Sequence, residues 1–455
     1  MQKAPNIDET IVALATPFGK GAIAVVRLSG KEAIDIADKC FKGADLKKVN
    51  SHTVHYGHLI NKSEVIDEVM LSVFKSPRTY TAEDVVEVSC HGSTYIQERV
   101  VQLFLDNGAR MADRGEFTLR AFLNGRIDLS QAEAVGDLIN AESEKAKQVA
   151  LNQMRGGFSR QIKKLKDQLV HFASMVELEL DFSEEDVEFA DRSALVNLVK
   201  ELLNSINGLL DSFKLGNVIR NGVPTVIIGR PNAGKSTLLN GLLQDERAIV
   251  SDIPGTTRDT IEEVLHLNGI SFRFVDTAGI REAEDVIESA GIERTRSKIG
   301  EASVMLYVFD PHNMTKEEYE SDLEKLRTYN KPFMSIANKA DLGLPEWLNG
   351  HGDETSISAK TNQGIEQVKE KLMGIMDLNA IDNSNVIVTN SRHYQSLNES
   401  QAALEDVLKA IDNGLTGDLL ALDIRRALHA LGEITGEITP DDLLGEIFSN
   451  FCIGK

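Results

Sequence analysis

The sequence predicts a multidomain fold that combines an α+β domain, a helical domain and an α/β domain, and three observations carry this prediction. The chain has 455 residues, and at roughly 150 residues per domain this length corresponds to about three domains. Short strand-like runs fill the N-terminal region, whereas apolar residues recur at helical spacing from about Ser130 and again from Gln401. Between these stretches, strands and helices alternate from Val223 to about Leu378.

The N-terminal region, residues 1–122, is predicted to be a small α+β domain. Three apolar runs predict strands, at Ile23–Leu28, Val69–Phe74 and Val85–Val88. Two amphipathic segments predict helices, at Lys31–Cys40 and Tyr95–Leu105. The pattern leaves the order of the strands in the sheet open.

The helical residues are expected to form one domain in two parts, 123–220 and 379–455, with an α/β domain at 221–378 inserted between them. Each helical part alone would expose an apolar stripe, so we favour insertion over the alternative of three sequential domains. The run VPTVIIG, Val223–Gly229, is almost continuously apolar. Such a run is typical of a parallel sheet covered on both faces.

The charge balance argues against a protein that coats nucleic acid by charge alone. The chain has 49 Lys and Arg against 70 Asp and Glu, a formal net charge of −21, and that mode of binding needs basic surface. Aromatic residues are only 5% of the chain, which argues against a surface that binds single-stranded nucleic acid by stacking bases on aromatic rings. A local basic site remains compatible with this composition.

The three cysteines, Cys40, Cys90 and Cys452, cannot form a disulfide framework, so we expect a reduced, cytoplasmic protein. No apolar run reaches the ~18 residues that span a bilayer. The N-terminal sequence lacks a signal-peptide pattern. We therefore expect no membrane association.

A phosphate-binding motif follows the strand VPTVIIG. Gly229 to Ser236 reads GRPNAGKS and fits G-x-x-x-x-G-K-[ST] between a strand and a helix. Glycines let backbone N–H groups surround phosphate oxygens, and the start of the helix adds a positive dipole end. Lys235 would contact the β- and γ-phosphates, and the Ser236 hydroxyl would bind Mg²⁺. The predicted nucleotide-binding residues here are Asn232, Ala233, Gly234, Lys235, Ser236 and Thr237.

Three later motifs, each after a strand-like run, indicate that the base is guanine. They are Asp276-Thr277-Ala278-Gly279, Asn338-Lys339-Ala340-Asp341 and Ser358-Ala359-Lys360. The Asp341 carboxylate can accept hydrogen bonds from N1–H and N2–H of guanine, whereas adenine has neither donor there. Asp276 would hold Mg²⁺ through water, and the Gly279 N–H would contact the γ-phosphate. The sequence therefore predicts GTP.

Residues 223–378 accordingly resemble a Ras-like GTPase domain of the translation-factor-related class. Thr257 then fits the switch I position that binds Mg²⁺. The residue after D-x-x-G, usually a water-orienting Gln, is Ile280 here, so another group must position the water. The acidic residues nearby are Glu282, Glu284, Asp285 and Glu288. One of them could position the water, or they could simply belong to a solvated loop and helix start. No arginine finger is marked, because Arg230, Arg258 and Arg281 could each be surface residues.

The flanking strings are more specific than the nucleotide motifs. They include IVALATPFGKGAIAVVRLSG, YTAEDVVEVSCHG, RGEFTLRAFLNGRIDLSQAEAV, DIPGTTRD, DTAGIRE and the terminal GEITPDDLLGEIFSNFCIGK. Through them the whole chain resembles the MnmE (TrmE) family of tRNA modification GTPases.

The resemblance implies a homodimer built through an N-terminal domain that binds 5-formyl- or methylene-tetrahydrofolate. The matching folate-contact positions are Arg27, Glu87, Arg126 and the terminal Lys455. The family often has Lys where Arg126 stands, and the two side chains differ in hydrogen-bond geometry. Each position could instead be an ordinary surface ion pair. The resemblance also implies that Cys452 lies near the folate site, where it is a candidate for the chemistry. One alternative is that Cys452 is a small buried apolar residue. The other is that it is a prenylation site, although Gly454 and Lys455 fit the prenylation signal poorly.

The resemblance also implies GTP hydrolysis without an external activating protein, with two G domains approaching each other in the presence of K⁺. Asn232 matches the potassium-binding asparagine. The loop Ser251-Asp252-Ile253-Pro254-Gly255-Thr256 would supply further oxygens, from Ser251, Ile253 and Thr256. The water-positioning glutamate matches Glu288, which answers the question that Ile280 raises.

The implied function is addition of an aminomethyl or carboxymethylaminomethyl group to C5 of the wobble uridine of certain tRNAs, with the flavoprotein MnmG (GidA) as partner. Folate would supply the carbon, and FAD and NADH the redox steps. A ribosome-assembly switch is a rival, although residues 378–455 carry five basic and twelve acidic residues rather than a basic appendage. A motor-like GTPase with a relic folate domain is a third hypothesis.

Overall fold

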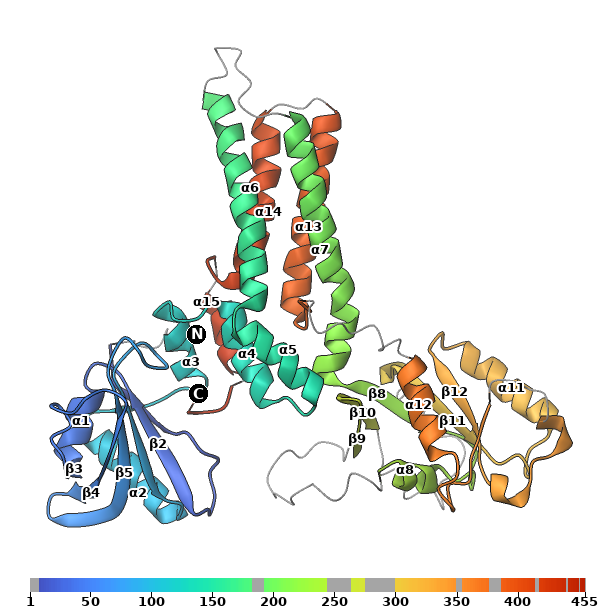
Figure 1. Cartoon of the computed structure of the whole chain (residues 1–455), viewed down its shortest axis with the longest axis horizontal. Coiled ribbons are helices and arrows are strands. Elements are labelled where there is room, and N and C mark those ends of the chain that lie inside the picture. The colour runs from blue at the N-terminus through green and yellow to red at the C-terminus, as the bar shows by residue number, and fades with distance from the viewer. Residues whose placement is uncertain are drawn as a thin grey trace. The chain divides into compact units, whose positions relative to one another are not determined.

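The computed structural model describes residues 8–181, 192–243, 263–274, 299–348, 354–375, 386–413, 417–438, 441–449 and 451–454. The chain divides into two compact units (Figure 1). The first unit comprises Met1–Ile139, Leu151–Asn204 and Gln395–Lys455, and the second comprises Asn140–Ala150 and Ser205–Tyr394.

The N-terminal part of the first unit is a seven-stranded sheet in the order β3-β4-β5-β6-β2-β1-β7, counted over the described residues. The strands are β1 Ile11–Leu14, β2 Ile23–Ser29, β3 Phe41–Lys42, β4 Thr53–Asn61, β5 Glu64–Phe74, β6 Val85–His91 and β7 Arg110–Met111. The helices α1 Ala33–Cys40 and α2 Thr94–Asp106 complete this part. All five elements predicted here are present, with ends that differ by a few residues.

Alternation along the strands separates a core face from a polar one. Val26 of β2 and Val88 of β6 are fully buried with α1 and α2, whereas their neighbours Arg27 and Glu87 point the opposite way. Arg27 and Glu87 are directly paired in the antiparallel register of β2 and β6. Strand pairing therefore places two predicted ligand-binding residues side by side.

Cys40 and Cys90 lie in this core, as expected of structural cysteines. Burial raises the pKa of each thiol to about 11. Both are therefore protonated and unreactive near neutral pH.

The helical part of the first unit joins segments from both ends of the chain. Its helices are α3 Glu116–Leu123, α4 Leu129–Ile139, α6 Gly157–Asp181, α14 Gly417–Thr435 and α15 Asp441–Ser449. The apolar faces of α6 and α14 pack together, with Leu165, Leu169, Ile424 and Leu431 buried. The helices α5 Glu144–Met154, α7 Arg192–Asn221 and α13 Ser391–Asp412 contribute residues to both units. This confirms the discontinuous helical domain with an inserted α/β domain; the boundaries at 122, 220 and 378 stay predictions.

The second unit holds a six-stranded sheet in the order β13-β12-β11-β8-β10-β9, again over the described residues. Its strands are β8 Val223–Ile228, β9 Glu263–Leu267, β10 Ile270–Phe274, β11 Val304–Phe309, β12 Phe333–Ala337 and β13 Thr355–Ser356. Its helices are α8 Lys235–Leu243, α11 Lys316–Arg327 and α12 Ile365–Ile375, with short 3-10 turns at Ala340–Leu342 and Glu346–Leu348. All the strand pairs are parallel except β9 with β10.

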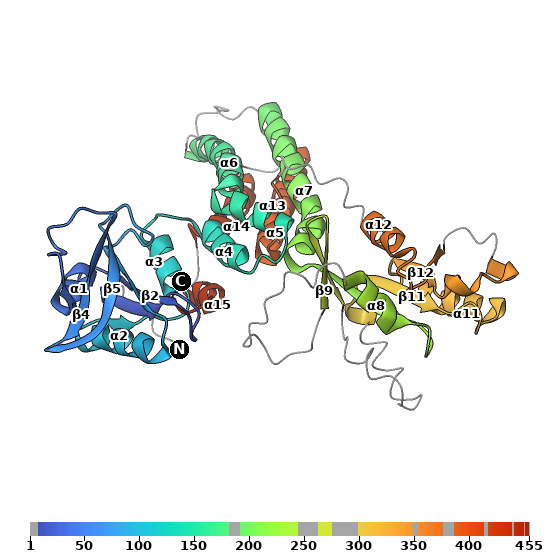
Figure 2. The same ribbon diagram turned by 60° about the horizontal axis from the view of Figure 1, so that its bottom comes forward.

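Both faces of this sheet are covered, as the apolar run at β8 predicts. Ile227 packs with α8 and α12 on one face, whereas Val226 packs with α11 on the other. Figure 2 shows these helices beside the strands of the sheet. Parallel strands end at one sheet edge, so the loops after β8, β11 and β12 gather there. Across the described part of the chain, no helix combines the length and apolar character needed to cross a membrane.

Candidate nucleotide and ligand sites

The loop between β8 and α8 has the backbone shape that a phosphate-binding loop needs. Gly234 has φ +94°, and a Cβ there would lie 2.1 Å from Nδ2 of Asn338. A Cβ at Gly229 would lie 2.0 Å from the carbonyl oxygen of Val308. Only glycine fits either position, so the two motif glycines are required by close packing. Asn232 between them is exposed and left-handed, with φ 62°.

Lys235 reaches back across this loop. Its Nζ donates to the carbonyl oxygens of Gly229 and Arg230, both at 3.0 Å. Burial lowers the pKa of Lys235, and a phosphate beside it would favour the charged ammonium. Ser236 and Thr237 follow in the first turn of α8, where backbone N–H groups and the helix dipole favour an anion.

Asn338 connects the base-recognition motifs to the phosphate loop. Its Nδ2 donates to the carbonyl oxygen of Ala233 at 2.8 Å, and its Oδ1 accepts from the Ala359 N–H at 3.0 Å. The side chain is buried. Three of the predicted motifs therefore meet in one hydrogen-bonded arrangement at the edge of the sheet.

The two charged residues beside Asn338 are held separately. A hydrogen bond from Ser358 lowers the pKa of the exposed Asp341, which stays a carboxylate able to accept from a guanine edge. Lys339 is left-handed at φ 65°, and its Nζ donates to Oδ2 of the buried Asp310 at 2.6 Å. Burial tends to raise the pKa of Asp310, but the bonds from Lys339, His312 and Asn313 hold it below the ordinary value. Lys360, also predicted, is exposed on the following turn.

Some predicted site residues lie outside the described residues. These are Ser251, Asp252, Ile253, Pro254, Gly255, Thr256, Thr257, Asp276, Thr277, Ala278, Gly279, Glu288 and Lys455. The other acidic candidates Glu282, Glu284 and Asp285, and the arginines Arg258 and Arg281, lie outside them too.

Three of the predicted folate-contact residues form one connected cluster with Tyr80. Arg27 donates from Nε to Oε1 of Glu87 at 2.8 Å. The guanidinium carbons of Arg27 and Arg126 lie 5.7 and 5.3 Å from the centre of the Tyr80 ring. Two cations thus lie near one aromatic ring, and a carboxylate pairs with one of them. This set of groups suits an anionic heteroaromatic ligand.

The C-terminal tail reaches the same cluster. Nη1 of Arg27 donates to the Gly454 carbonyl oxygen at 3.3 Å, and the Gly115 N–H donates to the Cys452 carbonyl oxygen at 3.4 Å. Cys452 is exposed. The alternative that Cys452 is a buried small hydrophobe is therefore wrong, because the tail lies along the surface with its backbone paired.

Comparison with known proteins decides the family. One family model, described as the MnmE helical domain, matches residues 129–452, and another, described as the GTP-binding protein TrmE N-terminus, matches residues 10–126. A protein of Cytophaga hutchinsonii named tRNA modification GTPase MnmE is 55% identical over 99% of this chain and 98% of its own. Relatives of that name from Flavobacterium johnsoniae and Bacteroides thetaiotaomicron are 51% and 47% identical, each over 98% of this chain and 99% and 100% of their own. The chain belongs to the MnmE family.

Among solved structures, the FeoB G-domain from Methanococcus jannaschii covers 34% of this MnmE-family chain and 97% of its own length. The sequence identity is 21% and the TM-score 0.25. The assignment to the MnmE family rests on the full-length relatives and the two family models.

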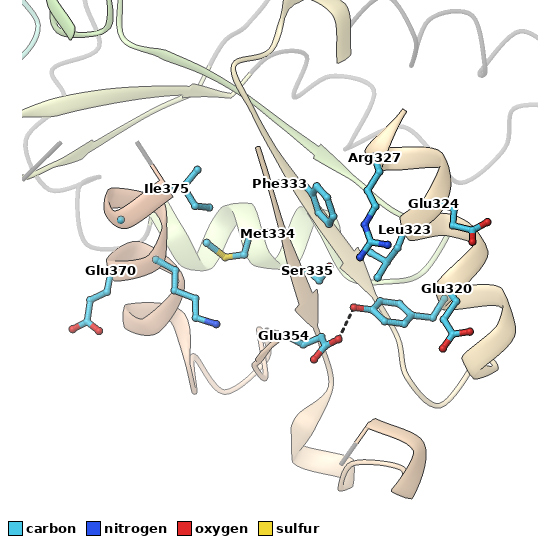
Figure 3. Close-up of a pocket in the computed structure, with 13 residues that line it drawn as sticks. Glu320, Leu323, Glu324, Arg327, Phe333, Met334, Ser335, Glu354, Glu370 and Ile375 are labelled. Atoms are coloured by element: carbon cyan, nitrogen blue, oxygen red, sulfur yellow. Dashed lines mark hydrogen bonds between the residues drawn. The ribbon is translucent and has the colours of Figure 1, made fainter. Parts of the chain in front are cut away.

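A cleft of about 970 Å³ lies elsewhere on the G domain of this MnmE-family chain, between α11, β12 and α12 (Figure 3). Glu320, Glu324, Arg327 and Glu370 line it, with Phe333 and Met334 of β12. Among the described residues, those of the phosphate-binding motif (the P-loop, Gly229–Ser236) and of the guanine motifs at 338–341 and 358–360 do not line this cleft. The cleft is therefore separate from the nucleotide site.

Three further residues belong to the two sites although no sequence motif predicts them. These residues contact the predicted site residues and hold them in place. The Tyr80 ring lies near Arg27 and Arg126, and the centre of the Phe117 ring lies 5.6 Å from the Arg27 guanidinium carbon. Asp310 accepts a hydrogen bond from Lys339. Tyr80 stands inside the MnmE-family string YTAEDVVEVSCHG, which was the available signal. Asp310 follows the strand VMLYVF directly, and polar residues at that strand end are a general signal of a site.

Proposed function

We propose that this chain hydrolyses GTP and acts in the modification of tRNA. The observation that carries the proposal is the Asn338 side chain, which joins the P-loop at Ala233 to the third motif at Ala359. Membership in the MnmE family supports the tRNA-modifying role. In this site Lys235 and the start of α8 bind the phosphates, and Asp341 selects guanine.

For hydrolysis, we propose that Ser236 and Thr257 bind Mg²⁺, since hydroxyl oxygens suit this ion. When bound, Mg²⁺ offsets negative charge on the β- and γ-phosphate oxygens. The proposed K⁺ ligands are Asn232, whose exposed position leaves its amide oxygen accessible, with Ser251, Ile253 and Thr256. Glu288 would orient the attacking water in place of the missing Gln, because Ile280 has no polar group.

For the tRNA reaction, we propose that Arg27, Glu87, Arg126 and Lys455 hold a 5-formyl- or methylene-tetrahydrofolate in a homodimeric, cytoplasmic protein. The folate supplies the one-carbon unit. MnmG would act as partner and supply FAD and NADH chemistry, so that the wobble uridine gains an aminomethyl or carboxymethylaminomethyl group. Cys452 is the proposed thiol near this site.

The decisive experiment is reconstitution with the flavoprotein partner and tRNA, followed by mass spectrometry of the wobble nucleoside with and without folate. A modified uridine that requires folate supports the proposal. An unchanged uridine under every condition would overturn it in favour of a ribosome-assembly switch. Modification that survives loss of folate binding would favour the motor-like alternative.

The catalytic assignment has its own test. Glu288→Ala is expected to keep GTP affinity nearly intact while slowing hydrolysis strongly, because a water-orienting group acts on the transition state. Equal loss of affinity and rate would contradict the assignment of Glu288.

A further inference from the structure

Arg230, the second residue of the P-loop motif, is bound to α11 rather than free. Its Nε donates to Oδ2 of Asp322 at 3.1 Å, and its Nη1 donates to Oε1 of Glu318 at 2.8 Å. From the sequence, Arg230 could be an ordinary surface residue, and no pattern marks it as an arginine finger. Its guanidinium instead makes a fork to two carboxylates on successive turns of one helix.

Asp322 is a shared acceptor. The same Oδ2 accepts the Tyr307 hydroxyl from β11 at 2.9 Å, and Nζ of Lys325 lies 3.5 Å from Oδ1. Tyr307 is buried, and burial together with the Asp322 charge raises its pKa far above the ordinary value. The hydroxyl therefore keeps its proton and donates to Asp322. This carboxylate joins the P-loop, the central strand β11 and α11.

The helix that carries Asp322 is firmly anchored. Thr315 and Glu318 form a capping box at its N-terminus. The buried Tyr319 donates to Oε1 of Glu354 at 2.7 Å, the dashed bond in Figure 3, and its ring lies 4.7 Å from that of Phe309. Because α11 is fixed by these contacts, its carboxylates can hold the side chain of Arg230 in one position.

The backbone of Arg230 is itself part of the phosphate loop. Its carbonyl oxygen accepts from Nζ of Lys235 at 3.0 Å and from the Ala233 N–H at 3.3 Å. Fixing Arg230 through its side chain therefore fixes the turn that presents the backbone N–H groups. When the loop is already held in its binding conformation, nucleotide binding does not have to supply the free energy of ordering the loop, so the affinity is higher.

We propose that Asp322 is a positioning residue for nucleotide binding, which acts through Arg230 to hold the P-loop in its phosphate-binding conformation. Arg230 is then a tether and not an arginine finger. This inference rests on the proposed binding of guanine nucleotides. It predicts that the tether affects affinity for GDP and GTP alike, because both place phosphates in the same loop.

The test compares Asp322→Asn, Arg230→Met and the double variant in the full chain. Glu320→Gln is the matched control, since Glu320 lies on the same helix, is exposed and contacts Lys316 rather than the P-loop. Binding is measured with fluorescent N-methylanthraniloyl GDP and GTP, and hydrolysis at saturating GTP. We expect each single variant to bind both nucleotides about 3- to 10-fold more weakly with a saturated rate within about twofold of the unsubstituted chain. The double variant should bind no worse than Arg230→Met alone, because both substitutions break one linkage.

Tyr307→Phe is a milder variant, which keeps the ring in the core and removes the hydroxyl that donates to Asp322 and also contacts the Met314 sulfur at 3.8 Å. It should weaken binding about twofold. Affinities of all variants equal to that of Glu320→Gln would show the inference to be wrong. A saturated rate that falls 100-fold or more in Arg230→Met at unchanged affinity would also overturn it, because that is the signature of an arginine finger. If the unsubstituted chain binds neither nucleotide, the proposed function itself fails.

Discussion

Nδ2 of Asn338 lies 2.8 Å from the carbonyl oxygen of Ala233, a residue 105 positions earlier in the chain. The bond connects the end of β12 to the phosphate loop after β8. Since Oδ1 of Asn338 also accepts from Ala359, one buried amide organises three loops. One side chain therefore holds together the phosphate loop and two base-recognition motifs of the candidate nucleotide site.

Asn338→Ala should weaken binding of both GDP and GTP and lower the stability of the G domain. The substitution leaves the Ala233 carbonyl and the Ala359 N–H buried without their partner, at about 1–3 kcal/mol for each group. Titration with fluorescent nucleotides and thermal unfolding would measure the two effects. Asn221→Ala, an exposed change at the end of α7, is the control and should leave both quantities unchanged.

Asp341→Asn should change base specificity from guanine toward xanthine. The carboxylate accepts from N1–H and N2–H of guanine, whereas an amide N–H can donate to the O2 carbonyl that xanthine has in place of the amino group. We expect GTP binding to weaken by about 100-fold or more, with XTP binding gained. Competition between the two nucleotides checks this, and retained preference for GTP would contradict the assignment of Asp341.

Arg27→Ala should abolish tetrahydrofolate binding without changing GTP hydrolysis. The substitution removes the cation that pairs with Glu87, stacks near Tyr80 and contacts the tail at Gly454. Isothermal titration with 5-formyl-tetrahydrofolate measures the loss. Arg99→Ala, which breaks only an exposed pair with Glu64, is the control and should bind folate normally.

Glu116→Gln should destabilise the first unit by about 3 kcal/mol at neutral pH, since it breaks a buried ion pair. Glu116 and Arg120 are each 1% exposed, with Nη2 of Arg120 at 3.0 Å from Oε1 of Glu116, and Nη2 of Arg110 lies 2.6 Å from the same oxygen. Burial tends to raise the pKa of Glu116, but the bonds from Arg110 and the Asp113 N–H, with the Arg120 charge, hold it below the ordinary value.

The pH dependence of this effect follows from the lowered pKa. The stabilisation is fully present above the ordinary carboxyl pKa and is lost as the pH falls through the lower value of the folded protein. The difference between Glu116→Gln and the unsubstituted chain should therefore shrink in acid. Hydrogen exchange of the α3 backbone from pH 7 downward measures it, and a difference independent of pH would rule out the ion pair as the cause. Glu64→Gln, at an exposed pair, should cost only about 0–1 kcal/mol.

Much of this architecture could be predicted from short patterns in the sequence. The run VPTVIIG marks β8, the motif GRPNAGKS marks the loop after it, and FMSIA marks β12, because strand burial and glycine geometry leave direct traces in residue type. The partnership of α6 with α14 was inferred only from unpaired apolar stripes, since the sequence contains no direct record of which stripe meets which.

The sequence by itself determined the domain classes, the P-loop, the guanine motifs and the family, because each depends on residues close together in the chain. The tertiary structure alone decided that Arg230 reaches Asp322, that Arg27 and Arg126 both lie near the Tyr80 ring, and that Cys452 is exposed. These relationships join residues 46 to 92 positions apart or depend on the path of the tail. Contacts of that kind are set by strand order and helix packing, which no local pattern records.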